Sequence, residues 1–172
     1  ANENANLQPN AETSHKRKAD WVSGEEYLLL MPPKVADAHL SGDLHVHDLE
    51  YFGTRPFCQD WDLRYFFYYG LMPDGMGTRT SVAGPAKHPE VAILHTAKIL
   101  ASAQTNFAGG EGFYNFLVFL APFMRRLSYD RIRQMMQMMF FEYTQAYVAR
   151  GGQLVFSNIQ VQPGVPELWR KI

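Results

Sequence analysis

The stretch GDLHVHDLEYFGTRPFCQDWDLR, residues 42–64, brings several chemically reactive side chains together. His45 and His47 are separated by one residue, and Asp48 follows them directly. Cys58 comes shortly afterwards and is the only cysteine of the chain. Three interpretations are open: structural histidines with a small buried thiol, a metal site, or a site of thiol redox or radical chemistry.

The metal and redox interpretations each need groups that this stretch does not supply. His-X-His on a strand is how amidohydrolase-like barrels present two zinc ligands, but a catalytic zinc needs at least three ligands from the protein. His39, His88 and His95 could complete such a site only if the fold brought them close. Cys58 cannot be both halves of a dithiol, so redox chemistry would need a second thiol or an external reductant.

The elements expected around this stretch indicate an α/β fold. Apolar and polar residues alternate over 44–49, which predicts a strand with His45 and His47 on one face. Residues 1–20 are polar and predict a loop or a segment that packs on something else. Helices are expected at 25–31, 33–40, 89–107, 113–124 and 129–150, and a second strand at 153–161. The order of strand, helices and strand is typical of an α/β architecture.

The composition excludes several classes of protein. The formal net charge is −1, so nothing favours electrostatic binding of nucleic acid or of a membrane surface. The longest apolar run, 113–124, contains Asn115 and Pro122 and is shorter than the roughly 20 residues of a membrane span. The polar start does not resemble a signal peptide, and one cysteine makes no intrachain disulfide. We therefore predict a cytoplasmic protein.

Four stretches carry a family resemblance and together span almost the whole chain. They are ENAN (3–6), GDLHVHDLEYFGTRPFCQDWDLR (42–64), SAQTNFAGGEGFYNFLVFLAPF (102–123) and YVARGGQLVFSNIQ (147–160). In this order they resemble the N-terminal half of the catalytic domain of anaerobic (class III) ribonucleoside-triphosphate reductases, most closely the archaeal type. The resemblance implies the first part of a ten-stranded α/β barrel of the glycyl radical enzyme type. It also implies a helical dimerisation and effector region at 89–150.

The resemblance implies a radical reduction of ribonucleoside triphosphates to deoxyribonucleoside triphosphates for DNA synthesis. In the family, a glycyl radical oxidises a finger-loop cysteine to a thiyl, which abstracts the ribose 3′ hydrogen, and the 2′ hydroxyl leaves as water. Formate or a thiol is the reductant. A radical SAM iron–sulfur enzyme generates the glycyl radical, and dNTP and ATP effectors regulate the homodimer.

The resemblance assigns catalytic roles to three residues. Cys58 matches the cysteine of the first barrel strand, which faces the sugar opposite the thiyl and acts as a reductant. His45 and His47 match histidines beside the substrate and the proposed formate position. They are expected to hydrogen-bond the substrate or hold formate, and to donate a proton to the leaving hydroxyl.

The resemblance also suggests binding residues outside the first stretch. Ser157 and Asn158 are expected to line the substrate pocket and to donate hydrogen bonds to phosphate. Lys98, Gln104 and Asn106 are candidate contacts for a deoxynucleotide effector. No metal ligands are expected among these residues.

Several parts that the family needs for catalysis are not found in the 172 residues. They are the finger-loop cysteine, the glycyl radical motif, the four-cysteine zinc site that usually accompanies it, and the ATP cone. The chain alone is therefore expected to be inactive, and to associate with itself or with its missing half, because a partial barrel leaves strand edges and an apolar face uncovered. The alternatives are a non-catalytic effector-binding and dimerisation module, and a His-X-His metallohydrolase.

Overall fold

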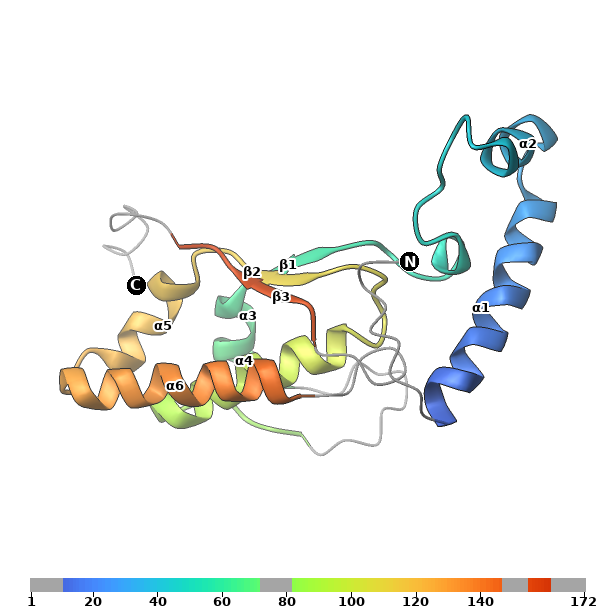
Figure 1. Ribbon diagram of the computed structural model, residues 1–172. Coiled ribbons are helices and arrows are strands. Elements are labelled where there is room, and N and C mark those ends of the chain that lie inside the picture. The colour runs from blue at the N-terminus through green and yellow to red at the C-terminus, as the bar shows by residue number, and fades with distance from the viewer. Residues whose placement is uncertain (1–10, 72–81, 147–154, 162–172) are drawn as a thin grey trace.

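The computed structural model describes residues 11–71, 82–146 and 155–161, and helices predominate in it (Figure 1). The helices are α1 (Ala11–Leu30), α2 (Pro33–Ser41), α3 (Leu63–Tyr69), α4 (Pro89–Ala103), α5 (Phe116–Met124) and α6 (Tyr129–Gln145), with a 3₁₀ turn, η1 (Leu49–Tyr51). The strands are β1 (Gln59–Trp61), β2 (Glu111–Phe113) and β3 (Ser157–Ile159). In the described ranges, no helix has the length and apolar character needed to cross a membrane.

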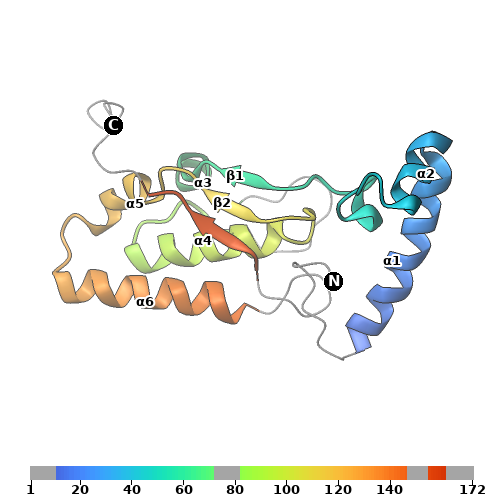
Figure 2. The same ribbon diagram turned by 45° about the horizontal axis from the view of Figure 1, so that its top comes forward.

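The three strands form one parallel sheet in the order β1-β2-β3. Helices α4 and α6 lie on one side of this sheet, as Figure 1 and Figure 2 show from two directions. The end residues Trp61, Phe113 and Ile159 are in register and pack into the core on the helix side. Because side chains alternate along a strand, the middle residues point to the opposite side. We call that side the open face.

The core lies between the sheet and the α4–α6 pair. Phe113, Leu100 and Met139 are almost completely buried there. The Tyr143 hydroxyl donates a hydrogen bond of 2.8 Å to Oγ1 of Thr96 and so joins the two helices. Burial raises the pKa of Tyr143, so the phenol stays protonated and keeps donating at any physiological pH. This packing fixes the sheet against the helices and leaves the open face free of them.

The N-terminal part, α1 with α2 and η1, projects from the rest of the molecule (Figure 1). The Lys16 ammonium lies 5.1 Å from the ring centre of Tyr51 on η1, and the Arg55 guanidinium lies 4.6 Å from it. The expectation of a loop was wrong from Ala11 onward, where α1 begins, whereas the alternative of a packed segment agrees with the contact of Lys16 with Tyr51. The helix expected at 25–31 is the last part of α1. Its residues are mostly good helix formers without an apolar stripe, so no hydrophobic periodicity reveals the helix.

The predicted strand at 44–49 was also wrong. Its backbone bonds back to α2, since Leu44 N–H donates to the Ala38 carbonyl and Val46 N–H donates to Nδ1 of His39. Asp48 then takes a left-handed conformation with φ 48°, which ends any extended path. The alternating pattern therefore lies in a turn, and the sheet begins only at Gln59.

The remaining elements follow the predicted order, and all but α2, which is one residue longer, are shorter than expected. The helices expected at 33–40, 89–107, 113–124 and 129–150 are α2, α4, α5 and α6, and β3 occupies three residues of the strand expected at 153–161. Strands β1 and β2 and helix α3 were not predicted. Residues 147–154 lie outside the described part of the chain. The α/β class is confirmed, and a three-stranded parallel sheet, not a ten-stranded barrel, is what the described residues contain.

Candidate functional site

Cys58 is a free, exposed thiol immediately before β1. The backbone N–H of Gly110 donates to its Sγ at 3.3 Å. A Cβ on Gly109 would collide with this Sγ and would lie 2.7 Å from the Phe57 carbonyl oxygen. Gly109 thus lets the backbone before β2 approach the cysteine closely, and the Gly110 N–H provides the thiol with a hydrogen-bond donor.

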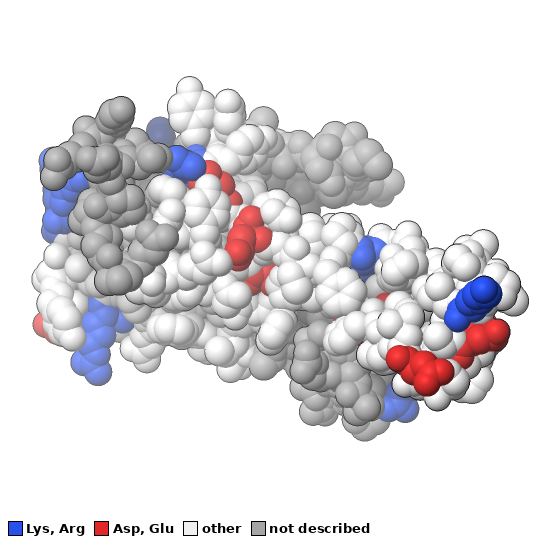
Figure 3. Space-filling view, turned by 90° about the horizontal axis from the view of Figure 1, so that it is seen from above, with Lys and Arg blue, Asp and Glu red and all other residues white. Residues whose placement is uncertain are grey.

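Polar side chains gather next to Cys58 on the open face. Asp60, Gly112 and Asn158 are partners in the register of the three strands and point to this face. Nε2 of Gln160 donates a hydrogen bond of 2.7 Å to Oδ2 of Asp60. Figure 3 views the molecule from above, and acidic side chains lie near the middle of this view. Cys58 lies two residues before Asp60 in the chain, immediately before β1.

The predicted histidines form a row of rings that leads toward the cysteine. The ring centre of His45 lies 5.7 Å from that of His39 and 6.0 Å from that of His47. The His47 ring in turn lies 5.3 Å from the ring of Phe57, the neighbour of Cys58 in the chain. The proximity of the two predicted histidines thus comes from a turn and not from a shared strand face.

One of these histidines has a buried acidic partner. Nδ1 of His47 is 3.3 Å from Oδ2 of Asp48, whose side chain is almost completely buried. His95 lies elsewhere, buried on α4, where burial lowers its pKa. Throughout the described ranges, no group of three or more His, Cys, Asp or Glu side chains is arranged to hold a metal ion.

Ser157 and Asn158 do not lie on the same side of the sheet. Asn158 is exposed on the open face, level with Gly112. Ser157 is level with Glu111 and points to the helix side, because consecutive residues of a strand face opposite ways. Strand register therefore brings Asn158, and not Ser157, to the face that carries Asp60, and the assignment of both residues to the substrate pocket stays a prediction.

The three candidate effector contacts differ in exposure. Lys98 on α4 and Asn106 after it are exposed. Gln104 is fully buried, and its amide is used twice inside the fold. Its Nε2 donates to the Gly109 carbonyl at 2.9 Å, and its Oε1 accepts from the Phe156 N–H at 3.0 Å. This geometry gives Gln104 a structural role, and the effector role of Lys98, Gln104 and Asn106 stays a prediction.

An acidic and a basic side chain join the carboxyl ends of β1 and β2. Asp62 caps α3 by accepting from the Arg64 N–H, and it also accepts from the Arg64 guanidinium and from the Tyr114 hydroxyl. Partial burial opposes ionisation of Asp62, but these hydrogen bonds outweigh it and the pKa of the carboxyl is lowered. The guanidinium lies 4.8 Å from the ring centre of Phe119 on α5. These contacts join the residues that follow β1 to the residue that follows β2, so the cluster has a structural role.

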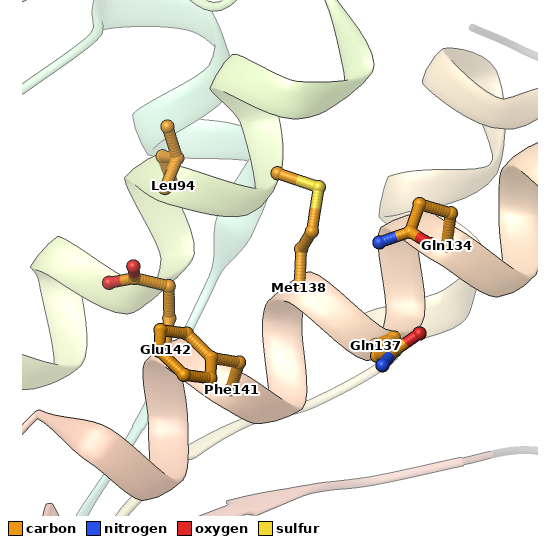
Figure 4. A pocket seen from close by; sticks show the side chains of 6 residues that line it. All are labelled: Leu94, Gln134, Gln137, Met138, Phe141 and Glu142. Carbon is orange, nitrogen blue, oxygen red and sulfur yellow. The ribbon is translucent and has the colours of Figure 1, made fainter.

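A separate pocket lies on the surface of the two long helices, away from the sheet (Figure 4). Its lining residues are Leu94, Gln134, Gln137, Met138, Phe141 and Glu142. Leu94 belongs to α4 and the others to α6. The pocket combines apolar surface with amide and carboxylate groups and falls within the predicted dimer and effector region.

Some site residues were missed by sequence analysis. Asp60 lies two residues after Cys58, and the alternation of a strand would have placed both on one side. Gly112 follows the Gly109–Gly110 pair in the pattern GGEG, which marks a strand that allows close approach. Gln160 carried no such signal, because its partner Asp60 is 100 residues away in the chain.

The family model and the curated relatives that match this chain carry the same description. The family model described as anaerobic ribonucleoside-triphosphate reductase matches residues 3–171. The reductase of that name from Salmonella typhimurium is 28% identical over 135 residues, which are 77% of this chain and 18% of the relative. The one from Enterobacteria phage T4 is 30% identical over 128 residues, which are 73% of this chain and 20% of the relative. The chain thus spans about a fifth of the length of these relatives.

Solved structures show the same fold. A structure described as anaerobic ribonucleotide reductase matches with a TM-score of 0.67 and 22% identity, over 91% of this chain and 27% of that chain. The enzyme from Thermotoga maritima in complex with dATP and CTP matches with a TM-score of 0.65 and 20% identity, over 87% of this chain and 26% of that chain. The archaeal type remains a prediction, since these named relatives come from bacteria and a phage.

Proposed function

Because this chain belongs to the anaerobic ribonucleoside-triphosphate reductase family, we propose that it forms the first part of the catalytic domain of such an enzyme. The observation that carries the proposal is the exposed Cys58 thiol, held by the Gly109–Gly110 backbone beside a sheet face that no helix of the described ranges covers. The substrate would be a ribonucleoside triphosphate, as in the relative solved with CTP. The remaining strands of the barrel would come from sequence outside these 172 residues.

The overall reaction sets what Cys58 must do. Replacing the 2′ hydroxyl by hydrogen consumes two electrons and two protons and releases water. In the family a glycyl radical starts this chemistry, and the radical-bearing glycine corresponds to no position of this chain. One thiol supplies one electron when it ends in a disulfide, so the two electrons would come either from Cys58 and a second thiol, which form a disulfide, or from formate, which is oxidised to carbon dioxide and leaves Cys58 as a thiol. Its exposure, immediately before β1, agrees with access to the sugar.

His45 and His47 would act beside the sugar as hydrogen-bond and proton donors. The buried Asp48 carboxylate next to Nδ1 of His47 would orient that imidazole toward the leaving hydroxyl, as a proton donor requires. His45, ring to ring with His47, would hold formate or a substrate oxygen. Nothing in this arrangement requires a metal.

The His47 role gives a direct test of the proposed function. In the full-length protein that carries this sequence, His47→Gln is expected to lower the rate of CTP reduction by about 10²-fold, because a positioned proton donor contributes about that much. The measurement is anaerobic formation of dCTP after activation. His15→Gln, on α1 and away from the site, is the matched control. Unchanged turnover in the His47 variant would remove His47 from the mechanism, and no reduction by the unaltered protein would refute the function.

The α4–α6 surface would form the dimer and effector region, at residues 89–150. Phe140 and Phe141 of α6 are 56% and 62% exposed, which is unusual for phenylalanines of a helix that already packs on a core. The pocket beside Phe141 and the exposed Lys98 lie on the same helix pair. We propose that a second copy covers this surface, and that Lys98 and Asn106 contact a deoxynucleotide effector there.

This interface predicts a change of oligomeric state. Phe141→Glu is expected to weaken dimerisation of the full-length protein by about tenfold or more, because a charge would be buried in the contact. Sedimentation velocity over a concentration series measures the dissociation constant. Tyr68→Glu, at an exposed aromatic residue of α3, is the control and should leave the dimer intact. Equal dimerisation of both variants would place the interface elsewhere.

The other partners follow from the family and complete the proposal. They are ATP and dNTP effectors and a radical SAM iron–sulfur activating enzyme. The proposed location of the protein is the cytoplasm. The family match over residues 3–171 does not favour the metallohydrolase or the non-catalytic module. Within the described ranges the histidines also do not combine with other ligands into a metal site.

A further inference from the structure

We propose that Asp60, together with Asn158, binds the ribose hydroxyls of the substrate and thereby selects ribonucleotides. This inference rests on the proposed function and adds a specificity-determining residue to it. It starts from the juxtaposition of a carboxylate and an amide over a glycine on the open face, two residues from Cys58.

The two side chains converge on the same point above β2. A Cβ built on Gly112 would lie within 2.5 Å of an oxygen of each, Oδ1 of Asp60 on one side and Oδ1 of Asn158 on the other. The two oxygens are therefore no more than about 5 Å apart. Any residue larger than glycine would displace one of them, so the missing side chain of Gly112 is what allows the pair to form.

The Asp60 carboxylate is held in place from the third strand. Nε2 of Gln160 donates to Oδ2 at 2.7 Å, and this leaves Oδ1 directed over Gly112. A carboxylate that has one oxygen anchored and the other exposed is a fixed acceptor. Gln160 is accordingly a positioning residue for Asp60.

The chemistry of the pair selects hydroxyl groups over phosphate. An ionised carboxylate only accepts hydrogen bonds and repels another anion, so the triphosphate cannot lie against Asp60. The neutral donors of a ribonucleoside triphosphate that come as a close pair are its 2′ and 3′ hydroxyls. One can donate to Asp60 and the other to Asn158, as acidic side chains bind ribose hydroxyls in dinucleotide sites. This would place the sugar beside the Cys58 thiol and moves Asn158 from the predicted phosphate role to a sugar role.

The test compares ligands with and without the two hydroxyls. Full-length, unactivated protein is saturated with dATP to fill the effector sites, and binding of CTP and of 2′,3′-dideoxy-CTP is measured by anaerobic equilibrium dialysis. Asp60→Asn is expected to weaken CTP binding by about tenfold, because a charge-assisted hydrogen bond becomes a neutral one. Binding of the dideoxy analogue should change by less than about threefold. Asp37→Asn, at an exposed carboxylate of α2, is the matched control.

The outcomes separate this inference from the proposed function. If the unaltered protein binds and, once activated, reduces CTP, but Asp60→Asn weakens both ligands equally or neither, the hydroxyl contact is refuted and the function stands. If the unaltered protein does not reduce CTP, the function itself fails. Gln160→Ala provides a second variant that keeps the carboxylate. It should lower the preference for CTP over the dideoxy analogue by about threefold, and an unchanged preference would remove Gln160 as the positioning residue.

Discussion

Replacing Cys58 by serine is expected to abolish reduction of ribonucleoside triphosphates while the protein stays folded. The thiol is exposed and makes one backbone contact, the hydrogen bond from Gly110 N–H, which a serine oxygen can also accept. A hydroxyl cannot replace the thiol as a reductant, so the loss should be about 10³-fold or more, the scale seen when a reacting group is removed. Anaerobic conversion of CTP to dCTP by the activated full-length protein measures it.

The control for this prediction is substrate binding. Cys58→Ser should bind CTP within about twofold of the unaltered protein, because the neighbouring Asp60 and Asn158 remain in place. A variant that still forms dCTP would show that Cys58 is not the reductant. A variant that loses CTP binding together with activity would show instead that the thiol supports the architecture of the site.

The elements that could be predicted from the sequence are those whose start depends on residues close by in the chain. Helices α4 and α6 begin at signals that act within a few residues, Pro89 at the first turn of one and the Ser128 side chain that caps the other. Helix α3 has a comparable signal in Asp62, which accepts from Arg64 N–H, but its aromatic run did not suggest a helix. Local capping thus places helices better than hydrophobic pattern does.

The strands could not be located in the same way. Each has three residues, too few for an alternating pattern to emerge, and each exists because a neighbour 40 or more residues away completes its hydrogen bonds. Residues 44–49 show the opposite case, since they alternate but have no neighbouring strand among the described residues. In this sheet, tertiary pairing overrides local pattern.

In the candidate site, too, some residues could be predicted from the sequence and others depend on tertiary pairing. Cys58, His45 and His47 could be proposed from residue type and from the family resemblance. The convergence of Asp60 and Asn158 over Gly112 depends on strand register, which no single stretch encodes. Register also explains why Ser157 and Asn158, although consecutive, face opposite sides. The sequence therefore suggests which residues can take part in chemistry, but the strand register decides which of them lie together.

Gln104 gives the second large prediction, and it concerns stability. Gln104→Leu is expected to lower the free energy of unfolding by about 3–5 kcal/mol. The side chain is fully buried and satisfies two backbone groups, the Gly109 carbonyl and the Phe156 N–H. Leucine has a similar size but no polar atoms, so both backbone groups would lose their partner, at about 1–3 kcal/mol each. The midpoint of urea denaturation of the full-length protein measures the change.

The same variant decides between two roles for this residue. Gln104 joins the glycine turn before β2 to the residue before β3, so its loss should also loosen the backbone that holds Cys58. Asn106→Ala is the matched control, because this nearby amide is exposed and should change stability by less than about 0.5 kcal/mol. If Gln104→Leu kept full stability and instead weakened binding of a deoxynucleotide, the structural role of the buried Gln104 amide would be refuted and an effector contact supported. If stability falls and the enzyme that remains folded binds its effector normally, Gln104 belongs to the framework that positions the thiol.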